Sequence, residues 1–525
     1  MKPEISRRRL LAGVAGAVGL VGISDVSGGR TFPAGLRAVG TNRVRAGDTG
    51  GTRSRVTATL RPRPVTVDLG GPHVTTWGYA DDLPGPLIRA RAGDTLRVEL
   101  VNGLPTDTSV HWHGIALPNN MDGVPGLTQP PIRPGCRYTY EFPLPHPGTY
   151  FYHPHSGVQL DRALYGVLIV DDPQEAGRYD HEWIVVLDDW IDGTGRTPDD
   201  ALAALRETGG HADMQGMDPA GAHGEGAEPD SHHDEGPDTS GHGGPASAGH
   251  GDMGGMEMMT SPLLGGAGDV SYPHHLVNGR VPAAPRVFRA RPGERARVRI
   301  INAGSDTAYR VALAGHRLTV THTDGFPVHP VDTDALLLGM GERVDVMVEL
   351  GDGVFPLIAD AEGKTGRGLA LVRTGSGATP PADVRLTELE GRVLDTATLH
   401  AAGSVRLVDR RPDRVHRLEL GGSMNPYRWT INGATFHDAD PLLVEQGERV
   451  RLEFVNRSEM FHPMHLHGHT FALTGGGARK DTVVVVPHQS VSVDFDAGNP
   501  GLWMVHCHNA YHAETGMMAT LAYRA

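Results

Sequence analysis

The sequence is poor in the residue types that define several protein classes. It has two cysteines, Cys136 and Cys507, among 525 residues, so at most one disulfide can form. Asp and Glu (62) outnumber Lys and Arg (48), and a formal net charge of −14 without a basic patch argues against a nucleic-acid partner. The mild apolar run at 10–23 is short for a membrane span and rich in Gly and Ala, so no stable span is expected.

Length and composition favour a β protein with several domains. At 525 residues the chain is too long for one hydrophobic core and suits about three domains of about 100 to 200 residues. Aromatic residues make up 6% of the chain, whereas 71 Gly and 39 Pro separate many short stretches that contain Val and Thr. This pattern predicts antiparallel β structure rather than helices.

One sequence pattern occurs three times along the chain. Residues 91–102 recur in similar form as 291–302 and 445–456, each with a Gly and an acid leading into an alternating strand. Three related β units are therefore predicted. Paired histidines follow the first and third copies but not the second, so only the end units are expected to hold metal.

The tripeptide His506-Cys507-His508 near the C-terminus carries the most chemical information. Consecutive side chains of a strand point to opposite faces, so the thiolate is expected on one face and the two imidazoles on the other. A metal held by Cys507 would then be connected, through the backbone of one strand, to metals held by His506 and His508 on the opposite face.

A mononuclear copper site is predicted around Cys507. Two imidazoles and a thiolate with a weak axial thioether are typical of an electron-transfer copper, whereas a zinc or structural metal site is disfavoured by the Cys-Met pairing. Met517 and Met518 could both supply the axial thioether. Because adjacent side chains of a strand point apart, only one of them is expected to reach the metal, and Met517 is assigned. The predicted ligands are His462, Cys507, His512 and Met517.

Further histidines occur as alternating pairs. Both members of such a pair lie on one strand face, about 6.6 to 7 Å apart along the strand. Together with the histidines that flank Cys507 they make eight imidazoles, enough for three more coppers with positions open for oxygen. The pairs are His111 and His113, His153 and His155, and His465 and His467.

The three histidine pairs and the segment around Cys507 resemble the ligand segments of the multicopper oxidases, the laccase-type blue copper enzymes. The resemblance covers nearly the whole chain after the leader. The resemblance implies cupredoxin-like Greek-key β-barrels and four coppers per chain, one type 1, one type 2 and two type 3. Asp122 matches the acid that relays protons to the trinuclear cluster, whereas Ala513-Glu514 matches only the second member of an acidic pair found in some bacterial relatives. The implied type 2 ligands are His111 and His465, and the two type 3 sets are His113, His153 and His508, and His155, His467 and His506.

The ends of the first and third units also match each other. Residues 148–155 parallel residues 501–508, with Pro154 in the place of Cys507. The first unit therefore lacks a mononuclear site, and its imidazoles are expected to close a shared cluster against the third. Cys136 is predicted to be a small buried thiol rather than a ligand.

The predicted organisation includes a leader and an insert. A twin-arginine pattern, Ser6-Arg7-Arg8-Arg9, precedes the apolar run and predicts export by the twin-arginine machinery to the periplasm, cell envelope or exterior; an ordinary Sec signal or uncleaved anchor is the alternative. The insert is rich in Met and His, is predicted to be disordered, and either binds copper or is an inert linker. The predicted parts are a leader at 1–45, a first unit at 55–190 with trinuclear ligands, the insert at 191–269, a second unit without copper ligands at 270–378, and a third unit at 379–525.

The sequence predicts an exported oxidase that couples one-electron oxidation of substrate to reduction of O₂ to water. The resemblance to copper-resistance oxidases favours Cu(I) as substrate, with Glu459 and Met460 as its docking residues. One alternative is a laccase that oxidises phenols or aromatic amines, and another is a non-catalytic copper chaperone or scaffold. A copper nitrite reductase is disfavoured because its chemistry needs fewer imidazoles.

Overall fold

The computed structural model describes residues 54–175, 179–208 and 260–524. The predicted leader and the Met- and His-rich part of the insert lie outside these residues. The described chain is nearly all β, as predicted, and forms three cupredoxin-like units, each with two main sheets that enclose apolar side chains. Within the described residues, none of the helices has the length and apolar character needed to span a membrane.

The first unit has a three-stranded sheet, β1-β5-β7, a four-stranded sheet, β4-β9-β8-β6, and the hairpin β2-β3. Strand β5 alternates between partly exposed and buried residues, as a strand with one face on the core should. Its elements are β1 (Arg55–Leu60), β2 (Arg63–Asp68), β3 (His73–Gly78), β4 (Gly85–Arg91), β5 (Thr95–Val101), β6 (His111–His113), η1 (Asn119–Met121), β7 (Arg137–Pro143), β8 (Gly148–His153), η2 (Gly157–Asp161) and β9 (Gly166–Asp171).

The second unit has two six-stranded sheets, β13-β10-β15-β20-β17-β18 and β14-β22-β21-β16-β19-β23. Its elements are β10 (His181–Trp190), β13 (His274–Val277), β14 (Arg286–Arg289), β15 (Arg295–Asn302), β16 (Tyr309–Leu313), β17 (Leu318–Thr323), β18 (Phe326–Thr333), β19 (Ala335–Leu338), β20 (Arg343–Glu349), β21 (Val354–Ala361), β22 (Arg367–Arg373), η4 (Thr387–Glu390), β23 (Val393–Asp395) and η5 (Thr396–Thr398).

The third unit has a six-stranded sheet, β25-β24-β27-β32-β29-β30, and a five-stranded sheet, β26-β34-β33-β28-β31. Its elements are β24 (Arg414–Met424), β25 (Tyr427–Ile431), β26 (Leu442–Val444), β27 (Arg449–Asn456), β28 (His462–Leu466), β29 (Phe471–Leu473), β30 (Arg479–Lys480), β31 (Thr482–Val485), β32 (Ser490–Asp496), β33 (Leu502–Cys507), α2 (Ala510–Glu514) and β34 (Met518–Tyr523).

Each unit differs from the antiparallel prediction because it contains two parallel strand pairs, one in each main sheet. In each unit the strand of the repeated sequence pattern runs parallel to the unit's first strand: β5 to β1, β15 to β10, and β27 to β24. A second parallel pair closes the opposite sheet: β4 with β9, β14 with β22, and β26 with β34. The equivalent placement of these pairs shows that the three units share one topology.

Strand β10 does not follow the predicted boundary at 190. It lies between β13 and β15 in the second unit's sheet, with Trp190 paired to His274 and Val185 paired to Ile300. Strand β23 likewise lies beyond the predicted end at 378 and pairs with β19. Hydrogen bonding between strands, which the sequence spacing does not reveal, decides which unit each strand joins.

The described part of the predicted flexible insert contains regular structure. Helix α1 (Pro198–Thr208) begins with Pro at its first position, and Thr197 and Asp200 form a capping box. Two short strands follow the undescribed segment, β11 (Thr260–Ser261) and β12 (Gly265–Gly266). Disorder throughout 191–269 is therefore wrong, because local capping signals and apolar positions support α1.

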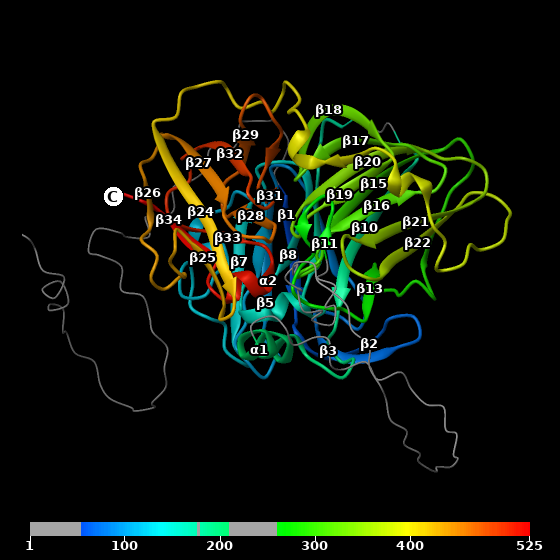
Figure 1. The fold of residues 1–525 in the computed structure, drawn as a ribbon, viewed down its shortest axis with the longest axis horizontal. Coiled ribbons are helices and arrows are strands. Elements are labelled where there is room, and N and C mark those ends of the chain that lie inside the picture. The colour runs from blue at the N-terminus through cyan, green and yellow to red at the C-terminus, as the bar shows by residue number, and fades with distance from the viewer. Residues whose placement is uncertain (1–53, 176–178, 209–259, 525) are drawn as a thin grey trace, which may run out of the picture. The chain divides into compact units, whose positions relative to one another are not determined.

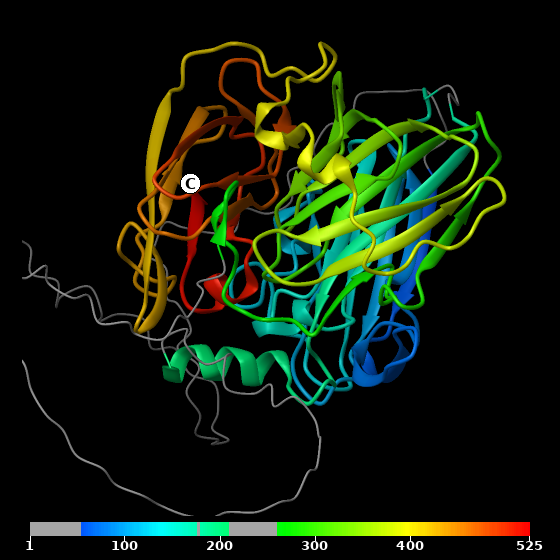
Figure 2. The ribbon, with the colours of Figure 1, turned by 45° about the vertical axis from the view of Figure 1, so that its right-hand side comes forward.

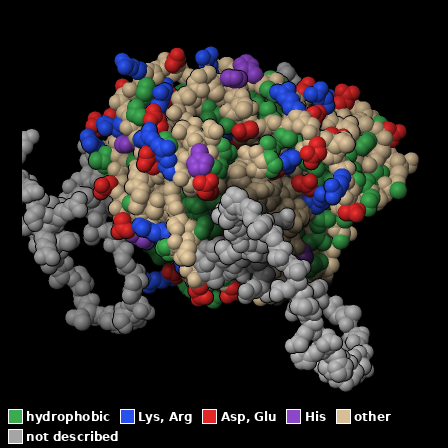
Figure 3. All heavy atoms as spheres, in the orientation of Figure 1, with side chains coloured by type: hydrophobic (Ala, Val, Ile, Leu, Met, Phe, Trp, Pro, Cys, Tyr) green, Lys and Arg blue, Asp and Glu red, His purple; other side chains and the backbone are tan. Residues whose placement is uncertain are grey.

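The first and third units lie side by side around β8 and β33 (Figures 1 and 2). The side-chain amide of Asn119 donates to the Leu502 carbonyl, and that of Asn499 donates to the Leu117 carbonyl. On the face drawn in Figure 3, basic and acidic side chains are interspersed.

Cys136 is exposed, so its predicted burial is wrong; it sits on the turn that leads into β7, away from the core.

Candidate metal centres

Three of the predicted mononuclear ligands meet in a buried space of the third unit. Cys507 ends β33, His462 begins β28, and His512 lies in α2, which is capped by the Asn509 side chain. The Nδ1 atoms of the two histidines are 3.1 Å apart, and Cys507 Sγ lies 3.6 and 3.7 Å from them. One ion can bind all three atoms of this triangle, which suits the trigonal arrangement of an electron-transfer copper.

The outer nitrogens of these two imidazoles are held by hydrogen bonds. His462 Nε2 lies 2.8 Å from Ser458 Oγ, and His512 Nε2 donates to Asp269 Oδ2 at 2.8 Å. The same Asp269 oxygen accepts from the Tyr427 hydroxyl at 2.6 Å. Such contacts fix the ring orientation and leave the inner nitrogens free for a ligand.

Met517, the predicted axial ligand, is fully buried beside this triangle. Its backbone N–H donates to the His512 carbonyl at 3.0 Å, and its carbonyl accepts from the Cys507 N–H at 3.1 Å. Met518 is partly buried and begins β34. The axial bond itself stays a prediction.

The eight other predicted histidines form one cluster between the first and third units, in which His155 is partly buried and the other seven are buried. In the first unit they lie on β6, at the end of β8 and two residues beyond β8, and in the third unit they lie on β28 and β33 or one residue beyond these strands. Side-chain atoms lie within 4.8 Å of one another in each of three groups: His113, His153 and His508; His155, His467 and His506; and His111, His113 and His465. The first two groups have the same members as the two predicted type 3 sets.

Backbone carbonyls orient many of these rings. A carbonyl can only accept, so each Nδ1 that contacts one is protonated and the ring's Nε2 carries a lone pair. The pairs are His111 with the Asp122 carbonyl, His153 with that of Pro154, His465 with that of Asp481, and His506 with that of Cys507. The Nε2 atoms of His111, His153 and His465 are buried without a hydrogen-bond partner.

Two of the inward nitrogens face each other. His467 donates from Nδ1 to Asp122 Oδ2 at 2.9 Å, and His506 donates from Nδ1 to a carbonyl. Their Nε2 atoms, both with lone pairs, are only 3.0 Å apart. Two such atoms repel each other unless a cation binds between them, so this geometry fits a metal site.

Comparison with known proteins identifies the family. Models described as multicopper oxidase match residues 63–175, 245–376 and 409–525. The multicopper oxidase MmcO of Mycobacterium tuberculosis is 45% identical, covering 99% of this chain and 97% of that protein. The chain belongs to the multicopper oxidase family. It is therefore a copper-binding oxidoreductase that uses oxygen.

Other proteins similar to this multicopper oxidase are described as copper-resistance proteins, laccases and an iron-import oxidase. Copper resistance protein A of Escherichia coli is 30% identical, covering 83% of this chain and 87% of that protein. The solved laccase of Botrytis aclada has 23% identity and a TM-score of 0.66 over 90% of this chain and 88% of its own, and shows the fold. Fet3p, described as a multicopper oxidase that functions in iron import, has 20% identity and a TM-score of 0.70 over 89% and 90%.

The protonation states of the free ligands suit copper. Burial raises the pKa of the Cys507 thiol, and a bound cation reverses this preference by binding the thiolate. Neutral imidazole is the form that binds metal. Burial lowers the pKa of His113, His153, His155 (to about 3), His462, His465, His467, His506 and His508, so these are neutral at pH 7.

Two acids, Asp122 and Glu514, were singled out from the sequence. Asp122 Oδ2 contacts His467, and its Oδ1 lies 3.3 Å from His111 Nδ1 but has no hydrogen-bond partner. Glu514 ends α2, and burial raises its pKa to about 6. Among the metal-binding groups of the described residues, Asp122 is the carboxylate that joins the histidines.

Two other acids were missed by the sequence analysis. Asp269 reaches His512 from the region assigned to the flexible insert. Asp481 Oδ1 accepts from His113 Nε2 at 3.0 Å. Burial alone would raise the pKa of Asp481, but Arg343 and His113 lower this pKa well below the usual range. Neither acid stands in a recognisable spacing from its histidine, so no local signal pointed to it.

The predicted Cu(I) docking residues lie on the surface beside the mononuclear site. The Glu459 side chain is 82% exposed and pairs with His488, 62% exposed, at 3.1 Å. Met460 is partly buried and packs next to Gly266 of β12. The structure thus keeps Met460 near the site and leaves Glu459 open to solvent.

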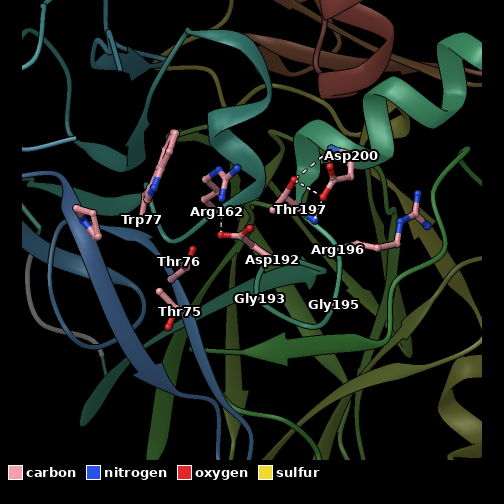
Figure 4. Close-up of a pocket in the computed structure, with 11 residues that line it drawn as sticks. Thr75, Thr76, Trp77, Arg162, Asp192, Gly193, Gly195, Arg196, Thr197 and Asp200 are labelled. Carbon is pink, nitrogen blue, oxygen red and sulfur yellow. Dashed lines mark hydrogen bonds and ion pairs between the residues drawn. The ribbon is translucent and has the colours of Figure 1, made fainter. Parts of the chain in front are cut away.

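A polar cavity of about 290 Å³ lies elsewhere, between the β2-β3 hairpin and the start of α1 (Figure 4). The Arg162 guanidinium stacks 4.2 Å from the centre of the Trp77 ring and pairs with Asp192 and Asp199. None of the predicted copper ligands lines this cavity.

Proposed function

We propose that this protein is an exported oxidase that removes electrons from Cu(I) one at a time and serves copper tolerance. The observation that carries the proposal is the strand β33, which presents Cys507 to one buried ligand set and His506 to another. The match to copper resistance protein A supports Cu(I) as substrate. Docking of a cuprous ion at Met460 and Glu459 is part of this proposal.

The proposed resident coppers number four. Bound copper would supply one-electron oxidation at the mononuclear site and four-electron reduction of O₂ at the cluster. His462, Cys507, His512 and Met517 would hold the first, His111 and His465 the type 2 ion, and His113, His153 and His508 with His155, His467 and His506 the type 3 pair.

The surrounding residues position the ligands and hold protons. Asp269 and Ser458 orient the two imidazoles of the mononuclear site. The four proposed ligands are all buried, which excludes water from the site. Asp122 Oδ1, which lacks a hydrogen-bond partner, is the atom we assign to receive and pass protons at the cluster.

Thioether chemistry supports a cuprous substrate over a phenol. Met sulfur is a soft ligand that selects Cu(I), and the Glu459 carboxylate adds negative charge that attracts a cation. Laccase activity on phenols is the second candidate, because Laccase-2 of Botryotinia fuckeliana is 26% identical over 83% of this chain.

Export by the twin-arginine route is proposed from the sequence motif at 6–9. A periplasmic, cell-envelope or extracellular location suits a protein that handles copper. Export of the folded chain would also allow the buried ligands to be loaded before transport.

The deciding experiment compares substrates in the copper-loaded full chain. Steady-state oxygen uptake is measured with Cu(I) and with a simple phenol, for the wild type and for a deletion of 209–259. We expect a higher kcat/KM for Cu(I), reduced by the deletion while phenol oxidation persists. A preference for phenol that the deletion leaves unchanged contradicts the copper-tolerance proposal and supports the laccase.

A further inference from the structure

The second unit contributes no group of metal-binding residues among its described residues, yet it contacts the cluster histidines directly. Gly341, between β19 and β20, packs against the rings of His508 and His113. A Cβ added there would lie 2.9 Å from His508 Cδ2 and 3.0 Å from His113 Cε1. The second unit thus forms a wall of the cluster.

Arg343, the first residue of β20, ties this wall to the other two units. Its Nη1 and Nη2 each donate to one oxygen of Asp481 at 2.7 Å. Its Nε donates to the Thr149 carbonyl of β8 at 3.1 Å, and Nη1 also donates to the Gly341 carbonyl at 3.1 Å. Both partners of the Arg343–Asp481 pair are fully buried.

Asp481 in turn orients two histidines from different units. Its Oδ1 accepts from His113 Nε2, and its backbone carbonyl accepts from His465 Nδ1 at 2.9 Å. The two rings stack with centroids 3.8 Å apart and an interplanar angle of 13°. His113 Nδ1 and His465 Nε2 are left buried without partners, the arrangement expected of ligand atoms.

We propose that Arg343 is a positioning residue of the trinuclear cluster, through which the second unit fixes Asp481, whose carboxylate orients His113 and whose backbone carbonyl orients His465. This inference rests on the proposed copper assignment of those histidines. The planar guanidinium binds both carboxylate oxygens at once and fixes their direction, which the point charge of lysine cannot do. Without it, a buried carboxylate would lack its cation and would turn or protonate, releasing the His113 ring.

A second buried arginine provides a matched control. Arg297 of β15 donates from Nη2 and Nε to Asp345 Oδ2 at 2.6 and 3.1 Å, and Asp345 accepts from the Thr149 hydroxyl at 2.7 Å. Asp345 lies two residues after Arg343 on β20, and this pair also links the first and second units. Arg299 also donates to Asp345, at 3.0 Å. Within the described residues, none of the hydrogen bonds of Arg297 reaches a predicted copper ligand, so its replacement reports the weakening of a buried ion-pair network alone.

The experiment measures copper binding in R343Q, R343K and R297Q. Copper per chain is determined by elemental analysis, the mononuclear site by its blue absorption, and the cluster by the type 2 signal in electron paramagnetic resonance. We expect R343Q to keep the blue absorption while cluster affinity falls about 10- to 100-fold, the range seen when an outer partner of a metal ligand is lost. R343K should lose less, and R297Q should keep a full copper complement despite lower stability.

Two outcomes would overturn the inference. One is a full trinuclear complement in R343Q. The other is an equal loss from both centres that R297Q reproduces, because it would assign Arg343 to general stability. If R343Q does not fold, R343K decides by copper titration: wild-type cluster affinity contradicts the proposal. A wild-type chain with all its copper but no oxidation of Cu(I) would contradict the proposed substrate without affecting this inference.

Discussion

The two candidate copper centres are assembled in different ways. The mononuclear site takes its three close ligand atoms from one unit, on β28, β33 and the short helix between β33 and β34. The cluster takes histidines from the first and third units and is braced by the second. A site within one unit depends on local register, whereas a site between units depends on their packing. Single substitutions should therefore affect one of the two copper centres and leave the other intact.

The largest separation is expected from C507S. A hydroxyl cannot replace the soft thiolate, so the blue absorption should vanish and oxygen uptake with either substrate should fall to background. The cluster histidines are untouched, and their copper should remain by elemental analysis and paramagnetic resonance. Undiminished turnover in this variant would contradict the role assigned to β33.

A smaller effect, confined to the cluster, is expected from D122N. Removing a positioned proton donor typically slows proton transfer about 100-fold or more. Reoxidation of the reduced enzyme by O₂ should slow by that factor, whereas anaerobic bleaching of the blue absorption by substrate should be unchanged. Equal slowing of both half-reactions by D122N would contradict the assignment.

D269N tests the mononuclear site alone. The amide retains the shape of the carboxylate but loses its charge, so electron transfer from Cu(I) should fall about 10-fold while copper stays bound. S458A probes the other imidazole in the same assay. If electrons enter at the His512 edge, D269N slows bleaching more than S458A. The reverse order would place electron entry at His462.

The smallest effect is expected at the surface. Exposed charged contacts are worth about 0.2 to 1 kcal/mol, so E459Q should raise the KM for Cu(I) by a factor of about 1.4 to 5. M460L should act in the same direction because it removes the soft sulfur. Steady-state kinetics with a phenol provide the control, since its KM should not move. A matching rise with phenol would indicate a general change in access.

Two of the mononuclear ligands have a local spacing, whereas His462, 45 residues before Cys507, was assigned from its own histidine-rich segment. Cys507 and His512 are five residues apart, and alternation along a strand is enough to separate Cys507 from His506. The histidine pairs followed from the same period of two. His111 and His113 do share one strand, β6, whereas His155, His467 and His508 lie one or two residues beyond the ends of β8, β28 and β33.

The supporting residues could not be predicted, because they act across long sequence separations. Asp269 is 243 residues from His512, and Arg343 is 138 residues from Asp481. Their partners are set by how sheets pack, which leaves no periodic signal. Helix α1 was missed for the opposite reason: its capping residues are visible at 197–200, but the surrounding Met- and His-rich composition obscured them.

The sheet membership of β10 limits how this enzyme can be recombined with its homologues. A chimaera that exchanges the second unit from residue 270 onward would take β13 and β15 from one parent and leave β10, their central partner, with the other. The new interface would run through the middle of a six-stranded sheet. Crossovers placed before His181 instead transfer the sheet intact and are the ones to choose in a shuffled library.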